Sequence, residues 1–577
     1  MRSSSSPRRV SRVVDLRHQG TLLAVALLCA ACAPATAPAT APSLSTAAAR
    51  RGGTVVFAWQ QPETLHPLYS TGTQTNALVY RLAVEGLVGI GPDGEPYPAL
   101  AEEVPTIANG GVSLTGGVMT VRYRLHDGIT WSDGAPLTAE DVRFTWRTIT
   151  TDPRVATREG YDQIEAIDVP DVRTAIVRYR GVYPAYATRF EALLPRHLLE
   201  GAAPAVREEF ARAPLGTGPF RITENVAGDH VTAERNERYR VKGRPYLDRV
   251  IIRFASSVDA AKAQLRAGEA DAMGSLAESD VVELEKDAAI RIASAPSPTV
   301  EALAFNLART GDPADAAAAK GVLGDIAVRR ALVRATPKDR IVEKLLFGRA
   351  RAGTSEIPVG WAAAPGLAQE PYDPDAARRL LEDAGWRAGA DGIRRKGDVR
   401  AAVRIVSTTG NKLREQVEQV LVDEWRAVGV EATIRNVPSS VLTAGWQSGG
   451  IRKRGDFDVL LANAGLGIGS TDPQSYLAQR HRCASIPRAD NQGAGANYER
   501  FCDERVDRLL DEAGATLDLA RRRAAYAEVL RVLNEGVVAI WLFDRGRYDA
   551  FRSRVGGYRS NGWDVVTWNA QEWFVRD

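Results

Sequence analysis

The spacing of apolar residues along the chain alternates between the period of a β-strand and that of an α-helix. Residues 54–59, TVVFAW, are rich in β-forming residues and are soon followed by a proline, which predicts a strand that runs into a loop. From Met119, MTVRYRLHDG alternates apolar and polar residues and predicts a strand that ends in a turn. From Phe457, FDVLLANAG is mostly apolar, which predicts a buried strand followed by a glycine-rich loop.

Four other segments have the apolar spacing or the end signals of helices. Residues 76–88 form the first of them. The run PLTAEDVRFTWRTI has Thr138 in the N-cap position and two acidic residues in its first turn. In YDPDAARRLLEDAGW, Asp373 can cap a helix that Gly385 closes, and residues 413–428 have a mostly apolar face. Because strands and helices alternate throughout, the sequence predicts a mixed α/β fold.

Length and charge narrow the class of protein. A chain of 577 residues is too long for a single compact core and predicts two or three domains. Lys and Arg total 74 against 71 Asp and Glu, for a formal net charge of +3. This balance, with basic residues scattered along the chain, gives no reason to expect nucleic acid as a partner.

The N-terminal segment has the features of an export signal. Five arginines precede the apolar run at 21–31, which has 11 residues, whereas a membrane-spanning helix needs about 20. Residues 1–31 are therefore predicted to be a signal peptide. The residues around Cys32 resemble a bacterial lipobox, whose cysteine receives lipid and becomes the mature N-terminus, although Cys29 stands where that pattern prefers Leu. Cleavage elsewhere in the alanine-rich stretch is the alternative.

Residues 32–50 contain little but Ala, Pro, Thr and Ser, which predicts an extended, lipidated tether. Cys483 and Cys502 are the only cysteines after this tether. Because paired cysteines usually bond outside the cell membrane, we expect a disulfide between them.

Motifs of catalysis and metal binding are largely missing from the sequence. No two histidines stand four residues apart, and neither G-x-S-x-G nor the phosphate loop occurs. Gly89, Gly91 and Gly94 match G-x-G-x-x-G, but prolines stand where a pyrophosphate-binding helix would have to begin. We interpret this segment as a polar turn between strands, and we expect no enzyme activity, no cofactor and no metal.

The run LHDGITWSDGAPLTAEDVRFTW, at residues 125–146, closely resembles the signature of the family 5 extracellular solute-binding proteins. These are the dipeptide-, oligopeptide- and nickel-binding receptors of ATP-binding-cassette (ABC) importers. Further segments that resemble the family occur in its order over about 500 residues: TLHPLYSTGTQTNALVYRLAVEGLV, GPDGEPYPALAEE, LPRHLLE, LGTGPFRITE, ERNERYRVKGRPYLDRVIIRF, LRAGEADAM, AFNLA, AVRRALVRATPKDRI and YDPDAARRLLEDAGW.

The resemblance implies a class II periplasmic-binding-protein fold, with two lobes around a hinge and an extra domain inserted in the first lobe. Lobe one is then discontinuous and comprises residues 51–88, 211–306 and 541–577. The inserted domain is expected at 89–210 and lobe two at 307–540. In the family, solute binds between the lobes, the lobes close, and the closed form docks on the permease.

The resemblance also suggests ligand contacts on both lobes. After LHP, the oligopeptide-binding relatives pair with the peptide through a stretch that here contains Thr71 and Thr73. From the second lobe, the relatives present A-G-W-x-x-D-x-x-[DE]-P, which AGLGIGSTDP at 464–473 matches in part. The remaining candidate contacts are Asn463, Gly465, Leu466, Gly469 and Trp541.

Two positions in this segment depart from the family. Leu466 stands where the relatives have Trp, and Gly469 stands where they have the Asp that holds the ammonium group of the peptide. An unpaired buried ammonium costs several kcal/mol. Another carboxylate therefore has to take the place of the missing Asp, and Asp456, Asp458 and Asp472 are candidates. Alternatively, the loop accepts a neutral or bulky ligand.

The expected partners are a peptide or other small solute, the permease and ATPase subunits of an importer, and the membrane through the lipid anchor. The protein itself is expected to be a monomer. A sugar, a nickel chelate, or a role as a surface sensor or chaperone remain open, although His66 is the only histidine in the matched binding segments. An exported hydrolase would need a nucleophile–base–acid set or a metal cluster, and neither is apparent.

Overall fold

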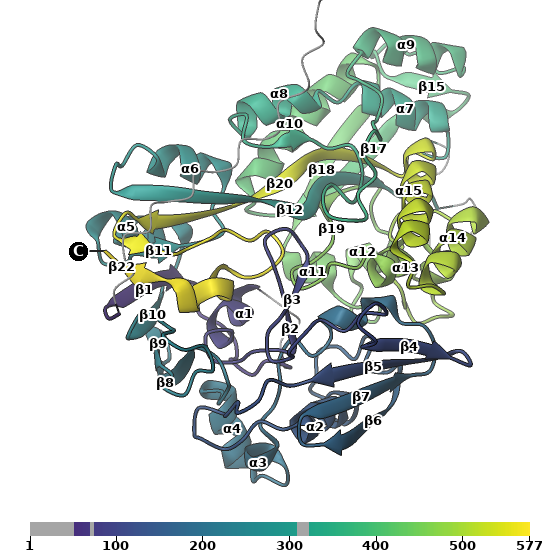
Figure 1. Cartoon of the computed structure of the whole chain (residues 1–577). Coiled ribbons are helices and arrows are strands. Elements are labelled where there is room, and N and C mark those ends of the chain that lie inside the picture. Colours follow the sequence, from purple (N-terminus) through teal and green to yellow (C-terminus); the bar gives the residue numbers. More distant parts are fainter. Residues whose placement is uncertain (1–50, 70–73, 309–321, 577) are drawn as a thin grey trace, which may run out of the picture. The chain divides into compact units, whose positions relative to one another are not determined.

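The computed structural model describes residues 51–69, 74–308 and 322–576. Eleven of the strands among them form one sheet, in the order β18-β17-β19-β12-β20-β11-β1-β10-β9-β8, with β13 paired to β20 (Figure 1). The strands are β1 (Thr54–Trp59), β8 (Phe220–Val226), β9 (His230–Arg235), β10 (Arg249–Phe254), β11 (Ala272–Met273), β12 (Ile290–Phe305), β13 (Arg351–Ala352), β17 (Ala402–Thr408), β18 (Glu431–Val437), β19 (Val459–Gly465) and β20 (Ala539–Arg552).

Strands β12 and β20 connect the two halves of this sheet. They are its two longest strands and run antiparallel, side by side (Figure 1). On one side β12 pairs with β19, and on the other side β20 pairs with β11. The register between them shifts between Pro296 and Val300 and again between Glu301 and Ala302. Regular pairing is therefore interrupted near the middle of the sheet.

Each half of the sheet contains parallel pairs, which need crossover connections. In one half, β17 and β18 are parallel and are connected by α10 (Lys412–Ala427), which buries Leu421 and Trp425. In the other half, β1 is parallel to both β10 and β11, and α5 (Val258–Ala267) connects β10 to β11. The structure is a mixed α/β fold, as the sequence predicts.

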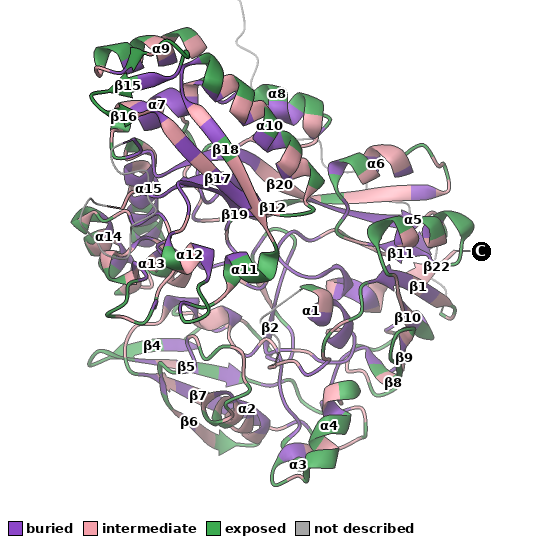
Figure 2. Cartoon of the chain, turned by 180° about the vertical axis from the view of Figure 1, so that it is seen from behind, coloured by how far each residue is buried: buried purple, intermediate pink, exposed green. Residues whose placement is uncertain are grey.

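The remaining helices are α1 (Gln74–Tyr80), α2 (Ala139–Thr151), α3 (Arg196–Leu199), α4 (Pro204–Arg212), α6 (Glu278–Leu284), α7 (Ile326–Arg334), α8 (Lys338–Leu345), α9 (Pro374–Asp383), α11 (Ser439–Thr443), α12 (Ile451–Arg454), α13 (Gln474–His481), α14 (Glu504–Gly514) and α15 (Leu519–Glu535), with 3-10 helices η1 (Pro184–Thr188), η3 (Cys483–Ser485) and η4 (Val566–Glu572). Figure 2 shows buried residues along β17 and β19 and exposed outer faces on α9 and α14.

A four-stranded antiparallel sheet has a core of its own. It runs β4 (Val112–Thr115), β5 (Val118–Arg124), β7 (Thr174–Tyr179), β6 (Ile164–Asp171). Helix α2 packs on it and begins after Thr138, which stands at the predicted N-cap position and whose backbone N donates to Asp141 Oδ2 at 2.8 Å. Fully buried Tyr123, Trp131 and Tyr179 belong to the core of this sheet.

Smaller sheets are formed by β2 (Val88–Ile90) with β3 (Pro96–Pro98), by β14 (Arg387–Ala388), β15 (Arg394–Lys396) and β16 (Val399–Arg400), and by β21 (Val555–Gly556) with β22 (Phe574–Val575). The glycine-rich segment with Gly91 and Gly94 is the turn between β2 and β3, as interpreted from its prolines.

The helix predicted over 76–88 is too long. Helix α1 ends at Tyr80, and a turn replaces its last part. The carbonyl groups of Leu82 and Ala83 accept hydrogen bonds from Phe220 N at 3.0 Å and Gly218 N at 2.7 Å. These backbone groups therefore pair with the start of β8 and the residues just before it instead of continuing the helix.

The predicted disulfide is confirmed: Cys483 and Cys502 are bonded, with their Cα atoms 4.7 Å apart. In the part of the chain that the structure describes, no helix has the length and apolar composition needed to cross a membrane. Contacts join the described residues into one unit within Ala49–Asp577, so the division into two lobes and an inserted domain stays a prediction.

Candidate functional site

A cavity of about 440 Å³ lies at the place where the register between β12 and β20 shifts. Residues 297–299 of β12 and 545–548 of β20 form one part of its wall. The loop after β19, at 466–468, and residues at the start of α10 form another part. Both halves of the sheet therefore contribute to a cavity whose volume is typical of small-molecule sites.

Three arginines and one glutamate are the charged side chains among the described residues that line this cavity. Glu301, on β12, is only 1% exposed. Arg414 Nε donates to Glu301 Oε1 at 2.7 Å, and Arg545 Nη1 donates to Glu301 Oε2 at 3.0 Å. Because two guanidinium groups share one carboxylate, this cluster has an excess positive charge.

The third arginine, Arg547, is 7% exposed and has a different partner. Its Nε donates to Asp549 Oδ2 at 3.3 Å, and its Nη1 donates to Asp564 O at 3.2 Å. The Tyr558 hydroxyl also donates to Asp549, which is fully buried. Arg547 Nη2 has no hydrogen-bond partner among the described residues, although leaving a buried donor unpaired costs about 1–3 kcal/mol.

The loop that follows β19 is fixed at its start by buried polar groups. Gly465 has a φ of +101°, and a Cβ there would lie 2.3 Å from Pro298 O, so glycine is required. Gly465 N donates to Tyr476 Oη at 2.7 Å, and this hydroxyl donates to Glu356 Oε1 at 2.6 Å. Burial would raise the pKa of Glu356, but His481, 2.5 Å away, together with Arg480 and the Tyr476 hydroxyl outweighs burial and lowers that pKa to about 2.

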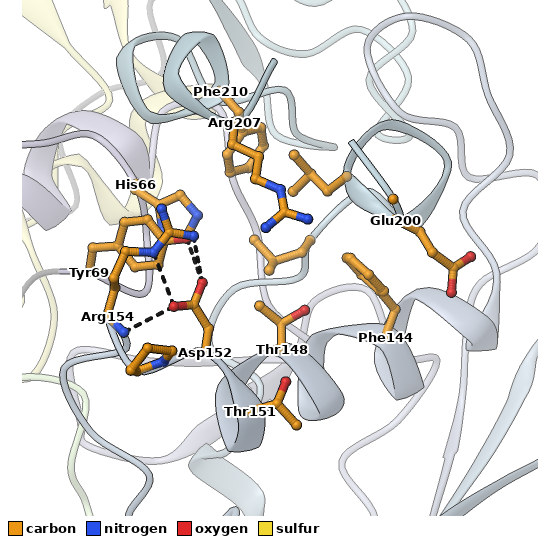
Figure 3. A pocket seen from close by; sticks show the side chains of 14 residues that line it. His66, Tyr69, Phe144, Thr148, Thr151, Asp152, Arg154, Glu200, Arg207 and Phe210 are labelled. Atoms are coloured by element: carbon orange, nitrogen blue, oxygen red, sulfur yellow. Dashed lines mark hydrogen bonds and ion pairs between the residues drawn. The ribbon is translucent and has the colours of Figure 1, made fainter. Parts of the chain in front are cut away.

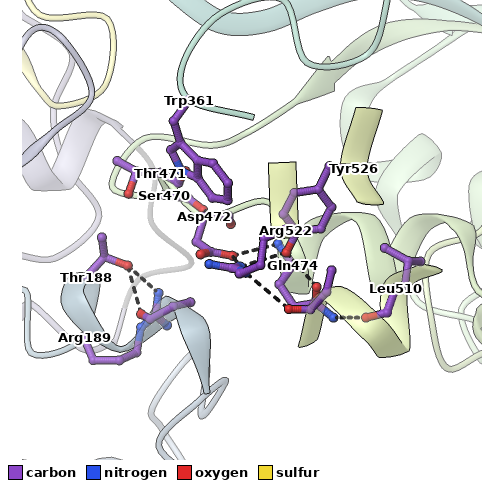
Figure 4. Close-up of polar contacts among 12 residues, drawn as sticks. Thr188, Arg189, Trp361, Ser470, Thr471, Asp472, Gln474, Leu510, Arg522 and Tyr526 are labelled. Atoms are coloured by element: carbon purple, nitrogen blue, oxygen red, sulfur yellow. Dashed lines mark hydrogen bonds and ion pairs between the residues drawn. The ribbon is translucent and has the colours of Figure 1, made fainter. Parts of the chain in front are cut away.

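The loop is also fixed at its end (Figure 4). Arg522 Nη2 donates to Asp472 Oδ1 at 2.6 Å, and Gln474 N donates to the same oxygen at 3.0 Å. Trp361 Nε1 donates to the carbonyl oxygen of Thr471 at 2.8 Å. Since buried contacts hold both of its ends, the loop has a fixed conformation before any solute binds.

A carboxylate lies beside Gly469, but it comes from a distant part of the chain. A Cβ at position 469, where φ is +80°, would lie 3.0 Å from Glu191 Oε2. Arg81 Nη2 donates to the same Glu191 oxygen at 3.2 Å. Burial raises the pKa of Glu191, and the positive charge of Arg81 opposes this shift. Glu191 is therefore already paired with a cation.

A family model described as the bacterial extracellular solute-binding proteins, family 5, matches residues 95–486. This range is more than half of the 577 residues. The chain belongs to family 5 of the bacterial extracellular solute-binding proteins. The resemblance stated from the sequence motifs is thereby confirmed.

Relatives of this solute-binding protein match it over most of its length. Protein XP55 of Streptomyces lividans is 27% identical over 91% of this chain and 89% of its own. The oligopeptide-binding protein AppA of Bacillus subtilis is 24% identical over 98% of this chain and 99% of its own.

Solved structures confirm the fold. The structure of AppA from Bacillus subtilis in complex with a nonapeptide has a TM-score of 0.70 and 22% identity, and covers 92% of this chain and 100% of its own. NikZ from Campylobacter jejuni in complex with Ni(L-His) has a TM-score of 0.72 and 23% identity, and covers 90% of this chain and 99% of its own.

The ligand contacts suggested by the sequence are spread over several places in the solute-binding protein. Asn463 and Leu466 line the cavity. Gly465 and Gly469 belong to the same loop, at its start and next to Glu191 respectively. Trp541 does not line this cavity and is buried in an apolar core cluster that also contains Leu466.

Thr71, Thr73 and Cys32 lie outside the described residues. The proposed substitutes for the missing aspartate do not line the cavity: Asp456 pairs with Arg404 and Arg435, whereas Asp472 pairs with Arg522. Asp458 Oδ2 accepts from Arg404 N at 2.7 Å.

The charged cluster around Glu301 was not anticipated from the sequence. A signal was present, because Glu301 interrupts the apolar run TVEALAF and two arginines interrupt WLFDRGRYDAF. Charged residues inside an apolar strand are costly unless they are paired. Such interruptions in a buried strand are therefore candidates for a functional site.

A second, larger cavity of about 490 Å³ lies next to α2 and α4 (Figure 3). His66 stacks on Tyr69 at a ring distance of 3.5 Å, and the Tyr69 hydroxyl donates to Asp152 Oδ2 at 2.8 Å. Burial and the positive charge of Arg154 lower the pKa of His66 to about 3. No residue of β12 or β20 lines this cavity, so we take the smaller cavity between the two connecting strands as the candidate site.

Among the described residues, no group of three or more His, Cys, Asp or Glu side chains is arranged to hold a metal ion.

Proposed function

We propose that this family 5 protein is the exported receptor of an ABC importer and captures peptide-like solutes in the cavity between β12 and β20. One observation carries the proposal: both halves of the sheet line the cavity, at the two strands that connect them. AppA, which matches this chain over nearly its full length, is named an oligopeptide-binding protein, and its solved structure holds a nonapeptide.

The proposed mechanism is hinge closure. In the predicted division, the chain passes from lobe one to lobe two at the end of β12 and returns at the start of β20. These two strands would therefore act as the hinge. A solute that contacts residues on both lobes, such as Asn463 on one side and Ser275 on the other, gains its full set of contacts only in the closed state. It therefore shifts the population toward that state, which the permease then recognises.

Export and anchoring complete the proposal. The signal peptide at 1–31 directs the chain out of the cytoplasm, and lipid on Cys32 holds it at the membrane through the tether at 32–50. The importer's permease and ATPase subunits are the expected partners, and the receptor acts as a monomer that binds and releases its solute without chemical change.

Native mass spectrometry of the full chain, purified in mild detergent from cells grown in rich medium, tests this proposal. A family of co-purifying masses that fragment as short peptides is the expected result. A single bound mass that is not a peptide would show that the receptor binds a different class of solute. A chain that binds no peptide from a defined library would refute peptide capture.

A further inference from the structure

The cavity next to α2 and α4 has an apolar floor (Figure 3). Three buried residues of one small core cluster line it: Leu194, Leu199 and Phe210. Phe144, which is partly buried, packs against the same cluster and also lines the cavity. This cluster leaves a volume of about 490 Å³ unfilled beside it, which is within the range of small-molecule sites.

Aromatic rings form much of the wall. The rings of His66 and Tyr69 are stacked 3.5 Å apart, and the Phe210 ring meets His66 edge-on at 5.3 Å. Figure 3 shows Phe144 across the cavity from this stack. Because aromatic rings make favourable edge-on and offset contacts with one another, these walls suit an aromatic ligand better than an aliphatic one.

His66 has a hydrogen-bond donor with no partner among the described residues. Its Nδ1 accepts from Leu68 N at 3.2 Å. Burial and the positive charge of Arg154 keep the ring neutral, since they lower the pKa of His66 to about 3. A neutral imidazole has one acceptor and one donor nitrogen, so the proton is on Nε2. Because His66 is only 4% exposed, leaving this donor unpaired is costly.

One of the charged side chains that line the cavity also lacks a partner. Arg154 pairs with Asp152 at 2.7 Å, and Glu200 pairs with Arg196 at 2.8 Å. Arg207, on α4, has no hydrogen bond or ion pair within the part of the chain that the structure describes. Figure 3 shows its guanidinium directed from α4 toward the cavity. The cavity therefore has one uncompensated positive charge above an apolar floor.

The free donor and the free charge are both close to Tyr69. The His66 ring stacks on Tyr69. Burial raises the pKa of Tyr69 to about 12, and the positive charge of Arg207 opposes this shift. A single polar group of a ligand can therefore be served by both His66 and Arg207.

We propose that this cavity is a second ligand site, which binds a small aromatic acid with its ring on the apolar floor and its carboxylate on Arg207 and His66 Nε2. A guanidinium group matches a carboxylate with two parallel hydrogen bonds. The exposed residues at the rim, among them Thr151 and Gly201, leave the site open to solvent. It shares no lining residue with the cavity between β12 and β20, so this inference does not depend on the proposed function.

Calorimetric titration of the full chain with four matched probes tests the inference. The probes are phenylacetate, phenylacetamide, cyclohexylacetate and acetate. Phenylacetate should bind, and phenylacetamide should bind about tenfold more weakly or worse, because the amide lacks the charge that pairs with Arg207. Cyclohexylacetate should bind about threefold more weakly or worse, because it lacks the aromatic ring. Acetate, which has no group for the apolar floor, should show no binding.

Protein variants provide the second measurement. Arg207→Met should weaken phenylacetate to the level of phenylacetamide and leave the affinity for phenylacetamide unchanged. Arg212→Met removes the same charge from an exposed position on the same helix, outside the cavity, and should affect neither probe. Gly467→Trp fills the cavity between β12 and β20 and should retain phenylacetate. Thermal melting of all three variants checks that they are folded.

Each contrary result overturns a stated part of the inference. Absence of phenylacetate binding by the folded protein would overturn the site itself. Equal affinity for phenylacetate and phenylacetamide would overturn the pairing with Arg207, and equal affinity for cyclohexylacetate would overturn the preference for an aromatic ring. Loss of phenylacetate binding in Gly467→Trp but not in Arg207→Met would place the acid between β12 and β20 and overturn the second site.

Discussion

Replacing Tyr476 by Phe tests whether buried polar contacts fix the start of the loop after β19. The Tyr476 hydroxyl accepts from Gly465 N at 2.7 Å and donates to Glu356 Oε1 at 2.6 Å. Phe keeps the ring but leaves one buried donor and one buried acceptor without that partner. Each such group costs about 1–3 kcal/mol, and Glu356 retains its contact with His481, so we expect a loss of about 2–4 kcal/mol.

Urea denaturation followed by tryptophan fluorescence measures this loss. Tyr372→Phe is the matched control, because its hydroxyl also donates to a carboxylate, Glu424 Oε2 at 2.5 Å, but Tyr372 is 43% exposed. Water can replace that bond, so the control should lose less than about 1 kcal/mol. Equal losses in the two variants would refute the reasoning that the buried network holds the loop.

Three further predictions concern other parts of the fold. Replacing Cys483 and Cys502 by Ser opens a link of sequence separation 19 and should lower stability by roughly 3 kcal/mol, measured by denaturation with and without reductant. The pKa of His66 is about 3 in the folded protein and about 6.5 in the unfolded chain. As the pH drops below about 6.5 the unfolded chain binds the proton first, so the stability of the fold decreases. The melting temperature of His66→Gln should therefore fall less between pH 7 and pH 4 than that of the original chain. Gly465→Ala introduces a Cβ 2.3 Å from a backbone oxygen at positive φ and should cost at least about 2 kcal/mol, whereas Gly467→Ala, whose Cβ would have no atom within 4 Å, should be neutral in the same denaturation assay.

Local signals in the sequence were sufficient to predict a helix or strand where its ends depend on neighbouring residues. Asp373 caps α9 by accepting from Ala376 N at 2.9 Å, and β19 is buried along most of its length, both as predicted. The end of α1 depends instead on backbone pairing with a segment well over 100 positions away, and no local pattern encodes that contact.

The candidate site was predictable only in part for the same reason. The family motif located the loop that contributes Leu466 to the cavity. The charged cluster, however, joins Glu301 to Arg414 and to Arg545 over separations of 113 and 244 residues. Its existence depends on the register of β12 against β20 and on the packing of α10, which the alternation of residues within one strand does not specify.

Blocking the cavity tests most directly whether it is the solute site. Gly467 lines the cavity and Gly181 does not, and a Cβ added at either glycine would have no atom within 4 Å. Native mass spectrometry of the full chain, purified from rich medium, should find bound solute in the original chain and in Gly181→Trp, and none in Gly467→Trp. Retention of the solute by a folded Gly467→Trp variant would contradict the placement of the site between β12 and β20.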